Sequence, residues 1–266
     1  MNLKKVVIPA AGLGKRFYPL TRAQPKEMLP LVDKPVIHYV VEEAVKSGLD
    51  EILIIVGKGK DAIMNYFDKT NIYEDLEKKY GIYDFPNIYF IRQKEQFGLA
   101  DAIRYAKSFV GDEPFVVLLG DTIYKSNNQL TVTQQLINIY TEHKLPVIAV
   151  EEVDKEKIKD YGIIKGNKIS EKVWLIKDLV EKPKIANAPS NMGITGTYIL
   201  ESDIFDYINR IKNGVNNEYQ LTDALKLLCK DKSLLGYKFE GKRYDIGTKE
   251  LWIKTFIEFS KEAGYI

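Results

Sequence analysis

The sequence has little of the chemistry on which many catalytic and metal sites depend. It contains one cysteine, Cys229, and two histidines, His38 and His143. A single cysteine excludes an internal disulfide and a cysteine-rich zinc site, and two histidines are too few for a histidine-rich metal centre. Both histidines fall in predicted helices, where we expect them to pack or to face solvent. The scarcity of thiols fits a reducing compartment, so we expect a cytoplasmic protein.

A strong excess of one charge and long apolar runs are also absent. Lys and Arg number 39 against 37 Asp and Glu, a net charge of +2 that is too balanced for a surface that coats nucleic acid. No apolar stretch approaches the roughly 18 residues that cross a bilayer, and residues 1–5 lead into a strand without an apolar signal region. We therefore expect a soluble protein with no nucleic-acid or membrane partner, in which any anion site is local.

Apolar, β-rich segments alternate with amphipathic segments through the first part of the chain. The predicted strands are residues 5–9, 51–56, 87–91, 114–119 and 146–151, and the predicted helices are residues 34–47, 60–67, 99–110 and 130–143. This alternation indicates right-handed βαβ units and therefore an α/β fold with a Rossmann-like, mostly parallel central sheet. Ligands of such sheets bind beyond the carboxyl ends of the strands.

The pattern changes near residue 161, where short strands and turns replace the regular alternation. Strands are predicted at residues 162–164, 179–181 and 196–200, and helices at residues 201–212 and 221–229. We interpret this part as a second, mixed α/β lobe. Residues 68–84 are charged and aromatic and predict an inserted helix and loop with no evident chemistry.

The first predicted strand runs into a loop of small residues that ends in two cations. Gly12 and Gly14 let backbone N–H groups approach phosphate oxygens, and Lys15, Arg16 and the nearby Lys26 supply charge-assisted donors. The loop lacks the third glycine of the dinucleotide fingerprint and the Gly-Lys-Ser/Thr of a Walker loop. We interpret it as a polyphosphate site. The alternatives are a plain strand-to-helix turn for the glycines and a solvated surface charge for Lys26.

Two aspartates stand where they could hold a metal. Asp121 directly follows the apolar strand 114–119, and Asp245 lies in the run Tyr-Asp-Ile-Gly-Thr. A carboxylate at the carboxyl end of a central strand is well placed to hold Mg²⁺ against a polyphosphate. Each aspartate could instead be a turn or N-cap residue. Two of them in one chain with a phosphate loop favour a metal site.

Further polar residues follow other predicted strands. Pro183 biases Lys182 to an extended backbone, which predicts that Glu181 and Lys182 point to opposite sides of the strand end. The carboxylate could then bind a sugar hydroxyl and the ammonium a phosphate, or the two could form a surface salt bridge. Gln93 and Gly98 could recognise a base edge through an amide and through close backbone approach.

Taken in order, these motifs resemble those of the sugar-1-phosphate nucleotidylyltransferases over nearly the whole chain. The motifs are Ala-Ala-Gly-Leu-Gly-Lys-Arg at 10–16, Pro-Lys-Glu-Met-Leu-Pro at 25–30, Gly-Leu-Ala at 98–100, Gly-Asp at 120–121, Tyr-Gly at 161–162, Val-Glu-Lys-Pro at 180–183, Tyr-Gln-Leu-Thr-Asp at 219–223 and Asp-Ile-Gly-Thr at 245–248. Within that superfamily, the motif at 25–30, the insertion opened at 66–68 and the turn at 188–191 are most similar to the bacterial and archaeal UTP:glucose-1-phosphate uridylyltransferase family. Residues 120–122 and 245–248 are more similar to thymidylyltransferases, so the choice between UTP and dTTP stays open.

The resemblance implies a role for each candidate residue. Nucleotide contacts are implied for Ala11, Gly12, Gly14, Glu27, Gln93 and Gly98, sugar-phosphate contacts for Gly162, Glu181 and Lys182, and Mg²⁺ binding for Asp121 and Asp245. Arg16, Lys26, Asp121 and Lys182 are the implied catalytic residues. The resemblance also implies a single nucleotidyltransferase domain over residues 1–266. Residues 1–160 would mainly bind the nucleotide, and residues 161–266 would form the sugar-phosphate-binding part and the C-terminal helices.

The activity implied by the resemblance is Mg²⁺-dependent transfer of a uridylyl group from UTP to α-D-glucose 1-phosphate. In-line attack at the α-phosphorus would give UDP-glucose and pyrophosphate, and the resemblance also implies a homodimer or homotetramer. Thymidylyl transfer, or dual use of UTP and dTTP, is the neighbouring alternative. A non-catalytic sensor of nucleotide sugars is the alternative from another class. We expect a sensor to lack Arg16, Lys26, Asp121 or Asp245, all of which this chain retains.

Overall fold

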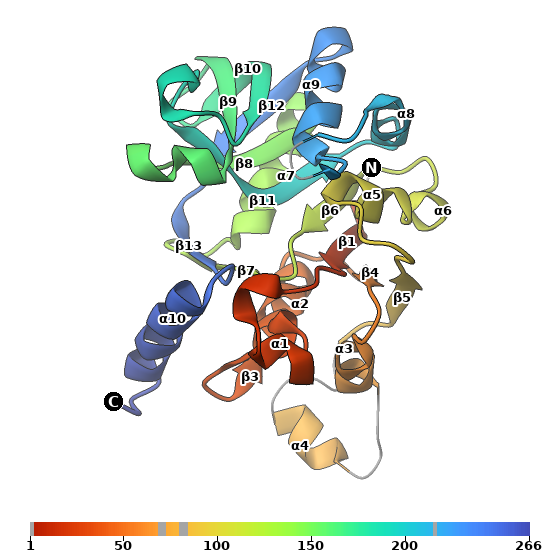
Figure 1. Cartoon of the computed structure of the whole chain (residues 1–266), viewed down its shortest axis with the longest axis vertical. Coiled ribbons are helices and arrows are strands. Elements are labelled where there is room, and N and C mark those ends of the chain that lie inside the picture. The colour runs from red at the N-terminus through yellow and green to blue at the C-terminus, as the bar shows by residue number, and fades with distance from the viewer. Residues whose placement is uncertain (1–2, 69–72, 80–84, 215–216) are drawn as a thin grey trace.

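The structure is a computed structural model, and it describes residues 3–68, 73–79, 85–214 and 217–266. Its centre is one nine-stranded sheet in the order β5-β4-β1-β6-β11-β8-β12-β10-β9, which runs through both halves of the molecule (Figure 1). Within the described ranges, no helix is long and apolar enough to cross a membrane. The strands of this sheet are β1 Lys5–Ala10, β4 Glu51–Val56, β5 Ile88–Arg92, β6 Phe115–Leu118, β8 Val147–Glu152, β9 Gly162–Lys168, β10 Val173–Glu181, β11 Met192–Leu200 and β12 Leu234–Lys238.

The direction of the strands changes across the sheet. β5, β4, β1 and β6 are parallel, whereas β11 is antiparallel to both β6 and β8. β12 returns parallel to β8, and β10 and β9 close the edge with antiparallel pairs. The mostly parallel sheet expected from the sequence therefore describes the β5 side, and the mixed lobe extends the same sheet rather than forming another one.

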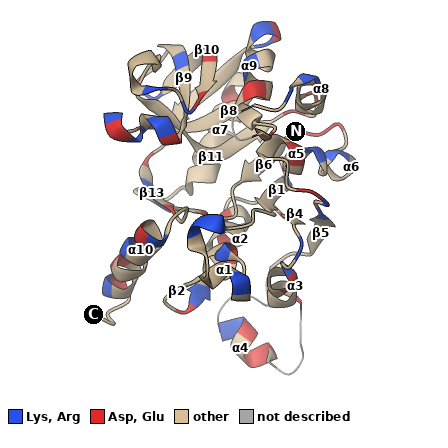
Figure 2. Cartoon of the chain, in the orientation of Figure 1, with Lys and Arg blue, Asp and Glu red and all other residues tan. Residues whose placement is uncertain are grey.

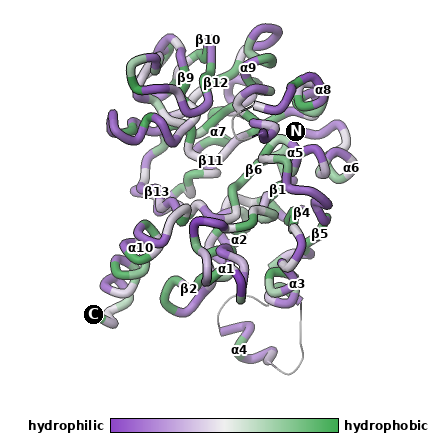
Figure 3. The backbone as a smooth tube through the Cα atoms, in the orientation of Figure 1, coloured by the Kyte–Doolittle hydropathy of each residue, from purple (hydrophilic) through white to green (hydrophobic). Residues whose placement is uncertain are grey.

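Helices cover both faces because successive strand residues point to opposite sides of the sheet. On β1, Val6 and Ile8 are buried in a cluster with α2 and α7, while Val7 between them is buried in a cluster with α5, α8 and α9. Figure 3 shows the resulting hydrophobic strands beside more hydrophilic connecting segments. The helices are α1 Leu20–Ala23, α2 Val36–Lys46, α3 Asp61–Phe67, α4 Glu74–Lys79, α5 Leu99–Arg104, α6 Lys107–Val110, α7 Val132–His143, α8 Ile204–Arg210, α9 Leu221–Asp231 and α10 Lys249–Glu262. The 3₁₀ helices include η1 Lys15–Phe17, η2 Lys26–Met28, η3 Lys155–Asp160 and η4 Ile185–Asn187.

Two small sheets flank the central one. β2 (Pro30–Leu31) pairs with β3 (Lys34–Pro35), and β7 (Thr122–Ser126) pairs with β13 (Gly241–Asp245), both antiparallel. After β13 the chain enters α10, which packs back on the N-terminal segment through Phe259 in a cluster with Phe17 and Leu31 (Figure 1). The end of the chain therefore helps to hold the loops that follow β1.

The elements expected from the sequence match the structure closely. The five strands predicted before residue 160 are all present, and the four helices predicted there differ mainly at their ends. The predicted helix at 99–110 is divided into α5 and α6, and the short strand predicted at 162–164 is the start of the longer β9. The helix predicted within 68–84 is α4, whereas residues 69–72 and 80–84 of the expected loop lie outside the described residues.

Candidate active site

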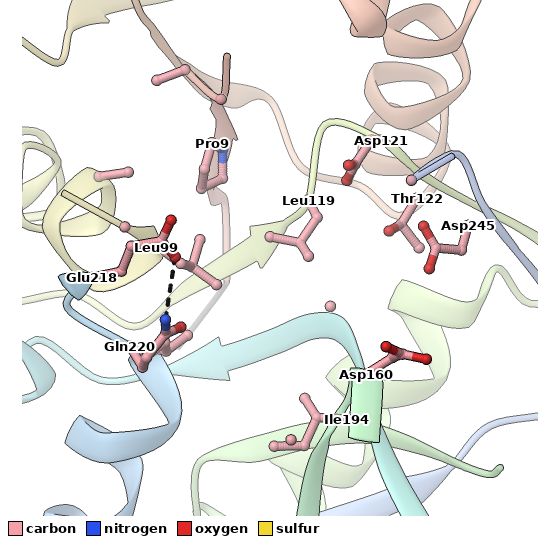
Figure 4. Close-up of a pocket in the computed structure, with 18 of the residues that line it drawn as sticks. Pro9, Leu99, Leu119, Asp121, Thr122, Asp160, Ile194, Glu218, Gln220 and Asp245 are labelled. Atoms are coloured by element: carbon pink, nitrogen blue, oxygen red, sulfur yellow. Dashed lines mark hydrogen bonds between the residues drawn. The ribbon is translucent and has the colours of Figure 1, made fainter. Parts of the chain in front are cut away.

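Every site residue predicted from the sequence lines one cleft of about 550 Å³. The cleft lies beyond the carboxyl ends of β1 and β6, which are parallel and therefore end at the same edge of the sheet. Its opposite wall comes from β9, β10, β11 and the segment before α9. Figure 4 shows lining residues from both walls, with Leu119 and Asp121 facing Ile194 and Asp160. The predicted residues that line it are Ala11, Gly12, Gly14, Arg16, Lys26, Glu27, Gln93, Gly98, Asp121, Gly162, Glu181, Lys182 and Asp245.

The loop after β1 needs glycine for two separate reasons. Gly14 has a positive φ of 63°, and a Cβ there would lie 2.7 Å from Cγ2 of Thr21. Gly12 is exposed, and a Cβ on it would lie 3.9 Å from Cε of Lys26, an ordinary van der Waals contact. Small residues therefore leave the backbone of this loop open to the cleft, as a bound phosphate requires.

Three charged side chains meet at the phosphate side of the cleft. Lys26 and Asp121 form an ion pair. Burial alone would lower the pKa of Lys26, but the neighbouring charges of Asp121 and Glu27 outweigh it and hold that pKa above its usual value. Burial would likewise raise the pKa of Asp121, but Lys26 lowers it overall. No described carboxylate lies within ion-pair distance of Arg16, so its guanidinium is available to an anion.

Asp245 reaches Asp121 through the pairing of β13 with β7. Asp245 is the register partner of Thr122, and the N–H of Ile246 donates to the carbonyl oxygen of Asp121 at 2.9 Å. Figure 4 shows the two carboxyl groups on the same side of the cleft. Burial and then the charge of Asp121 raise the pKa of the Asp245 carboxyl group. The charge of Asp121 therefore disfavours the ionised form of Asp245.

The donor set at this position suits Mg²⁺. Among the described residues, no group of three or more His, Cys, Asp or Glu side chains is placed to hold a metal ion. Two carboxylates with open space beside them do not match a zinc or calcium cage. Mg²⁺, however, is usually held by one or two carboxylates together with water and substrate phosphates. Asp121 and Asp245 therefore fit the group that the sequence implied.

Glu27 lies beneath the phosphate loop, and its carboxylate is paired with a residue that the sequence analysis missed. Oε2 of Glu27 accepts a hydrogen bond from Nζ of Lys60 at 2.6 Å, and both side chains are buried. Burial lowers the pKa of Lys60, with the charge of Glu27 opposing that shift. Lys60 precedes α3 in a loop with no recognisable motif, so only the fold identifies it as a partner of Glu27.

Gln93 and Gly98 lie at the far end of the cleft. The side-chain amide of Gln93 donates to Oδ2 of Asp101 at 2.6 Å, which fixes the orientation of that amide. Gly98 has a φ of 105°, and a Cβ on it would lie only 2.7 Å from the carbonyl oxygen of Tyr219. The close approach predicted for Gly98 is thus made with another part of the chain, and it joins the two walls of the cleft.

The expectation for Glu181 and Lys182 was wrong in its geometry. Lys182 has a positive φ of 45° instead of an extended backbone, and its Nζ lies 3.3 Å from Oε1 of Glu181. The N–H of Lys182 donates to the carbonyl oxygen of Tyr161 at 2.9 Å. This bond fixes the turn after β10 and overrides the preference that Pro183 imposes, so both side chains face the cleft.

Gly162 and Thr222 shape the surroundings of Glu181. Gly162 is the register partner of Glu181, and a Cβ on it would lie 3.1 Å from Oε2 of that carboxylate. The hydroxyl of Thr222 donates to the same Oε2 at 2.6 Å. Thr222 had no predicted role, although it lies in one of the motifs that carry the resemblance. Because Oε2 of Glu181 accepts from Thr222, Oε1 is the oxygen that faces Lys182.

Arg243 is a third residue, after Lys60 and Thr222, that had no predicted role. It lines the cleft and contacts Glu151, Tyr161 and Asp245. Its position two residues before Asp245 on one strand places both side chains on the same face, which was the available signal.

The charges on the rest of the molecule are mixed, and Figure 2 shows both signs on both halves.

The family model described as "Nucleotidyl transferase" matches residues 5–262. The chain belongs to this family. Together with the large mixed α/β sheet, this match confirms the nucleotidyltransferase fold expected from the sequence.

Three similar proteins refine the position of the chain within the nucleotidyl transferases. A Staphylococcus haemolyticus protein named UTP–glucose-1-phosphate uridylyltransferase is 46% identical, over 97% of this chain and 93% of that protein. A solved UDP-glucose pyrophosphorylase in complex with UDP-glucose is 41% identical with a TM-score of 0.94, covering 98% of this chain and 100% of its own. A UTP-bound enzyme of the same kind from Acinetobacter baumannii is 31% identical with a TM-score of 0.88, covering 98% and 94%. The resemblance to the uridylyltransferase family is confirmed, as is the prediction of a nucleotidyltransferase enzyme instead of a sensor.

Proposed function

We propose that this chain transfers the uridylyl group of UTP to α-D-glucose 1-phosphate, with UDP-glucose and pyrophosphate as products. The observation that carries the proposal is the single cleft that joins an open phosphate loop, two facing aspartates and the Glu181–Lys182 pair. The names of the relatives support the choice of UTP and glucose. We also propose that residues 1–160 mainly bind the nucleotide and residues 161–266 the sugar phosphate. Residence in the cytoplasm and assembly into homodimers or homotetramers stay predictions.

In this proposal the phosphate side of the cleft binds the nucleotide triphosphate. The open backbone around Gly12 and Gly14 donates N–H groups to phosphate oxygens, and Arg16 and Lys26 add charge-assisted donors. Ala11 lines the nucleotide, Glu27 supports this loop through Lys60, and Gln93 and Gly98 contact the pyrimidine. The anchored amide of Gln93 suits base recognition because its orientation is fixed before the base arrives.

The opposite wall binds the sugar phosphate. The carboxylate of Glu181 accepts from sugar hydroxyls, the ammonium of Lys182 binds the phosphate, and Gly162 keeps the space between them open. The nucleophile is a phosphate oxygen of glucose 1-phosphate, which is already ionised near neutral pH. The step therefore needs no general base, in keeping with a cleft that no histidine lines.

The main obstacle to the reaction is the repulsion between two polyanions. Like charges a few Å apart repel by about 4 kcal/mol at an effective dielectric of about 20. Arg16, Lys26 and Lys182 offset this repulsion and hold the attacking oxygen, the α-phosphorus and the leaving pyrophosphate in line. Mg²⁺, which Asp121 and Asp245 would hold, would supply further positive charge for the phosphates during transfer.

Pyrophosphate release from the purified protein tests this proposal. The protein is incubated with glucose 1-phosphate and UTP, dTTP, CTP or ATP, with and without Mg²⁺. We expect release with UTP that requires Mg²⁺. No release with any nucleotide contradicts the proposed function.

The dTTP reaction addresses the alternative that the sequence left open. UTP and dTTP differ at the base by one methyl group, and a pocket discriminates a methyl by only about 1–3 kcal/mol. Turnover with dTTP at a similar rate would identify a dual enzyme. A clear preference for dTTP would favour a thymidylyltransferase, the enzyme to which the motifs at residues 120–122 and 245–248 are more similar.

A further inference from the structure

Arg243 joins three parts of the chain at the wall of the cleft. Its side chain is only 8% exposed. Nε donates to Oε1 of Glu151 at 2.8 Å, and Nη2 donates to the hydroxyl of Tyr161 at 2.6 Å. Nη1 lies 3.5 Å from Oδ2 of Asp245. A buried guanidinium is thus shared between a strand of the central sheet, the sugar-phosphate side and one of the two facing aspartates.

Tyr161 connects Arg243 to the sugar-phosphate cation. Its hydroxyl accepts from Arg243, and the guanidinium carbon lies 5.1 Å from the centre of its ring. Its carbonyl oxygen accepts the N–H of Lys182, which has a left-handed backbone. Tyr161 therefore binds the turn at Lys182 through its carbonyl oxygen and Arg243 through its hydroxyl.

The contacts exceed those that a purely structural arginine needs. A salt bridge to Glu151 alone would compensate the buried charge. The remaining N–H groups instead go to Tyr161 and toward Asp245, both of which line the cleft. Arg243 itself also lines the cleft, but its donors are directed to protein groups.

We propose that Arg243 is a positioning residue for the reaction, one that fixes the Asp245 carboxylate relative to the Tyr161–Lys182 turn. This inference rests on the proposed function, in which Asp245 and Lys182 both serve the phosphates of the reaction. Catalysis by positioning is sensitive to small displacements, and an error of about 1 Å can cost about 100-fold in rate. Arg243 limits this error because one rigid planar group contacts both sides.

The geometry requires arginine instead of lysine. A guanidinium presents five N–H donors in a fixed plane and can reach three acceptors at once. A lysine at this position would keep the positive charge beside Glu151, but its single ammonium could not contact Tyr161 and Asp245 together. Arg243→Lys therefore removes the positioning and keeps the charge.

The test compares Arg243→Lys with Lys242→Arg on the same strand. Lys242 is exposed and pairs with Glu258 on the surface, outside the cleft. For Arg243→Lys we expect kcat to fall at least tenfold and the KM for glucose 1-phosphate to rise at least fivefold. The KM for UTP should rise less than the KM for glucose 1-phosphate, because Arg243 reaches the nucleotide side of the cleft indirectly, through Asp245. Lys242→Arg should match the wild type in all three constants.

Calorimetric titration gives a readout that does not depend on turnover. Arg243→Lys should bind UDP-glucose at least fivefold more weakly and UTP within twofold of the wild type, both measured without Mg²⁺. Tyr161→Phe removes only the hydroxyl that Arg243 contacts, and it should shift UDP-glucose binding in the same direction. It serves as the second variant if Arg243→Lys does not fold, as judged by circular dichroism.

Two outcomes overturn the inference. One is wild-type kinetic and binding constants in both Arg243→Lys and Tyr161→Phe. The other is an equal loss of UTP and UDP-glucose binding, which indicates general damage to the fold. A failure of the proposed function is seen separately, as absence of pyrophosphate release from the wild-type protein. In that case the titrations still decide whether Arg243 governs the sugar-phosphate side.

Discussion

Asp121 and Asp245 are held beside each other by a backbone bond between the loop before β7 and the residue after β13. The N–H of Ile246 donates to the carbonyl oxygen of Asp121 at 2.9 Å, next to the register pair of Thr122 and Asp245. The separation of the two carboxylates is therefore set by the backbone. The charge of Asp121 raises the pKa of Asp245, and each carboxylate has a cationic neighbour, Lys26 beside Asp121 and Arg243 beside Asp245.

Replacing Asp121 tests the metal site directly. We expect Asp121→Asn to abolish Mg²⁺-dependent release of pyrophosphate and to leave the circular dichroism spectrum unchanged, because a neutral amide is a weak ligand of almost the same shape. Asp154→Asn, at an exposed aspartate paired with Lys157, is the control and should be fully active. Near-normal turnover of Asp121→Asn would exclude Asp121 as the main metal ligand.

Glu181→Gln tests the sugar side of the cleft. A hydrogen bond to a charged group contributes about 1.5–3 kcal/mol, so we expect the KM for glucose 1-phosphate to rise roughly 10- to 100-fold. The KM for UTP should not change, since Glu181 lies on the opposite wall. Steady-state kinetics with each substrate varied in turn measure both. Glu152→Gln, at an exposed glutamate paired with Lys238, is the control, and a larger effect on UTP would contradict the assignment.

Gly98→Ala tests the close approach of this backbone to Tyr219. Both Gly98 and Gly59 have a positive φ, and Gly98 adds a ψ of −178°, a backbone region that almost only glycine adopts and that costs an alanine up to about 3 kcal/mol. A Cβ on Gly98 would also collide with Tyr219, whereas nothing lies within 4 Å of one on Gly59. We therefore expect Gly98→Ala to lower the free energy of unfolding further than Gly59→Ala does, measured in urea. It should also raise the KM for UTP, and equal effects of the two variants would count against this contact.

The buried pair of Lys60 and Glu27 predicts a large effect on stability. Lys60→Met leaves the carboxylate of Glu27 buried without its partner, and breaking such a pair typically costs about 3–5 kcal/mol. Urea unfolding at neutral pH measures the loss. Lys157→Met, which breaks an exposed pair with Asp154, should cost less than about 1 kcal/mol. The two variants would have similar stability if the Glu27–Lys60 contact were only superficial.

His38 predicts a pH dependence of stability. Burial, assisted by the charge of Lys34, lowers its pKa to about 4, against about 6.5 in an unfolded chain. Between these values only the unfolded chain binds the proton, so the free energy of unfolding falls as the pH drops below about 6.5. The contribution is about 2 kcal/mol at pH 5 and about 3 kcal/mol below pH 4.

Urea unfolding at pH 7.5 and pH 5 measures the effect of His38. The matched variant is His38→Gln, whose neutral amide keeps a hydrogen-bonding group near the hydroxyl of Tyr66. We expect it to lose less stability at pH 5 than the wild type does. The same loss in both proteins would assign the pH dependence to other groups.

Most of the architecture could be predicted because its signals are local. The continuous apolar run of Val6, Val7 and Ile8 indicates a strand buried on both faces, and the helical spacing of residues 34–47 predicts α2. The reversal of direction at β11 could not be predicted, since it depends on which strands pair. Lys182 was assigned the wrong backbone because a distant carbonyl, that of Tyr161, decides its turn.

The βαβ pattern, the residue types of the phosphate loop and the resemblance that pointed to nucleotidyl transfer could all be taken from the sequence. These follow from the spacing and chemistry of residues that are neighbours in the chain. Three contacts became visible only in the folded chain. Asp245 lies beside Asp121, Lys60 pairs with Glu27, and Arg243 contacts both Tyr161 and Asp245. The physical reason is that strand register and burial select these partners, and both arise from contacts between segments far apart in the sequence.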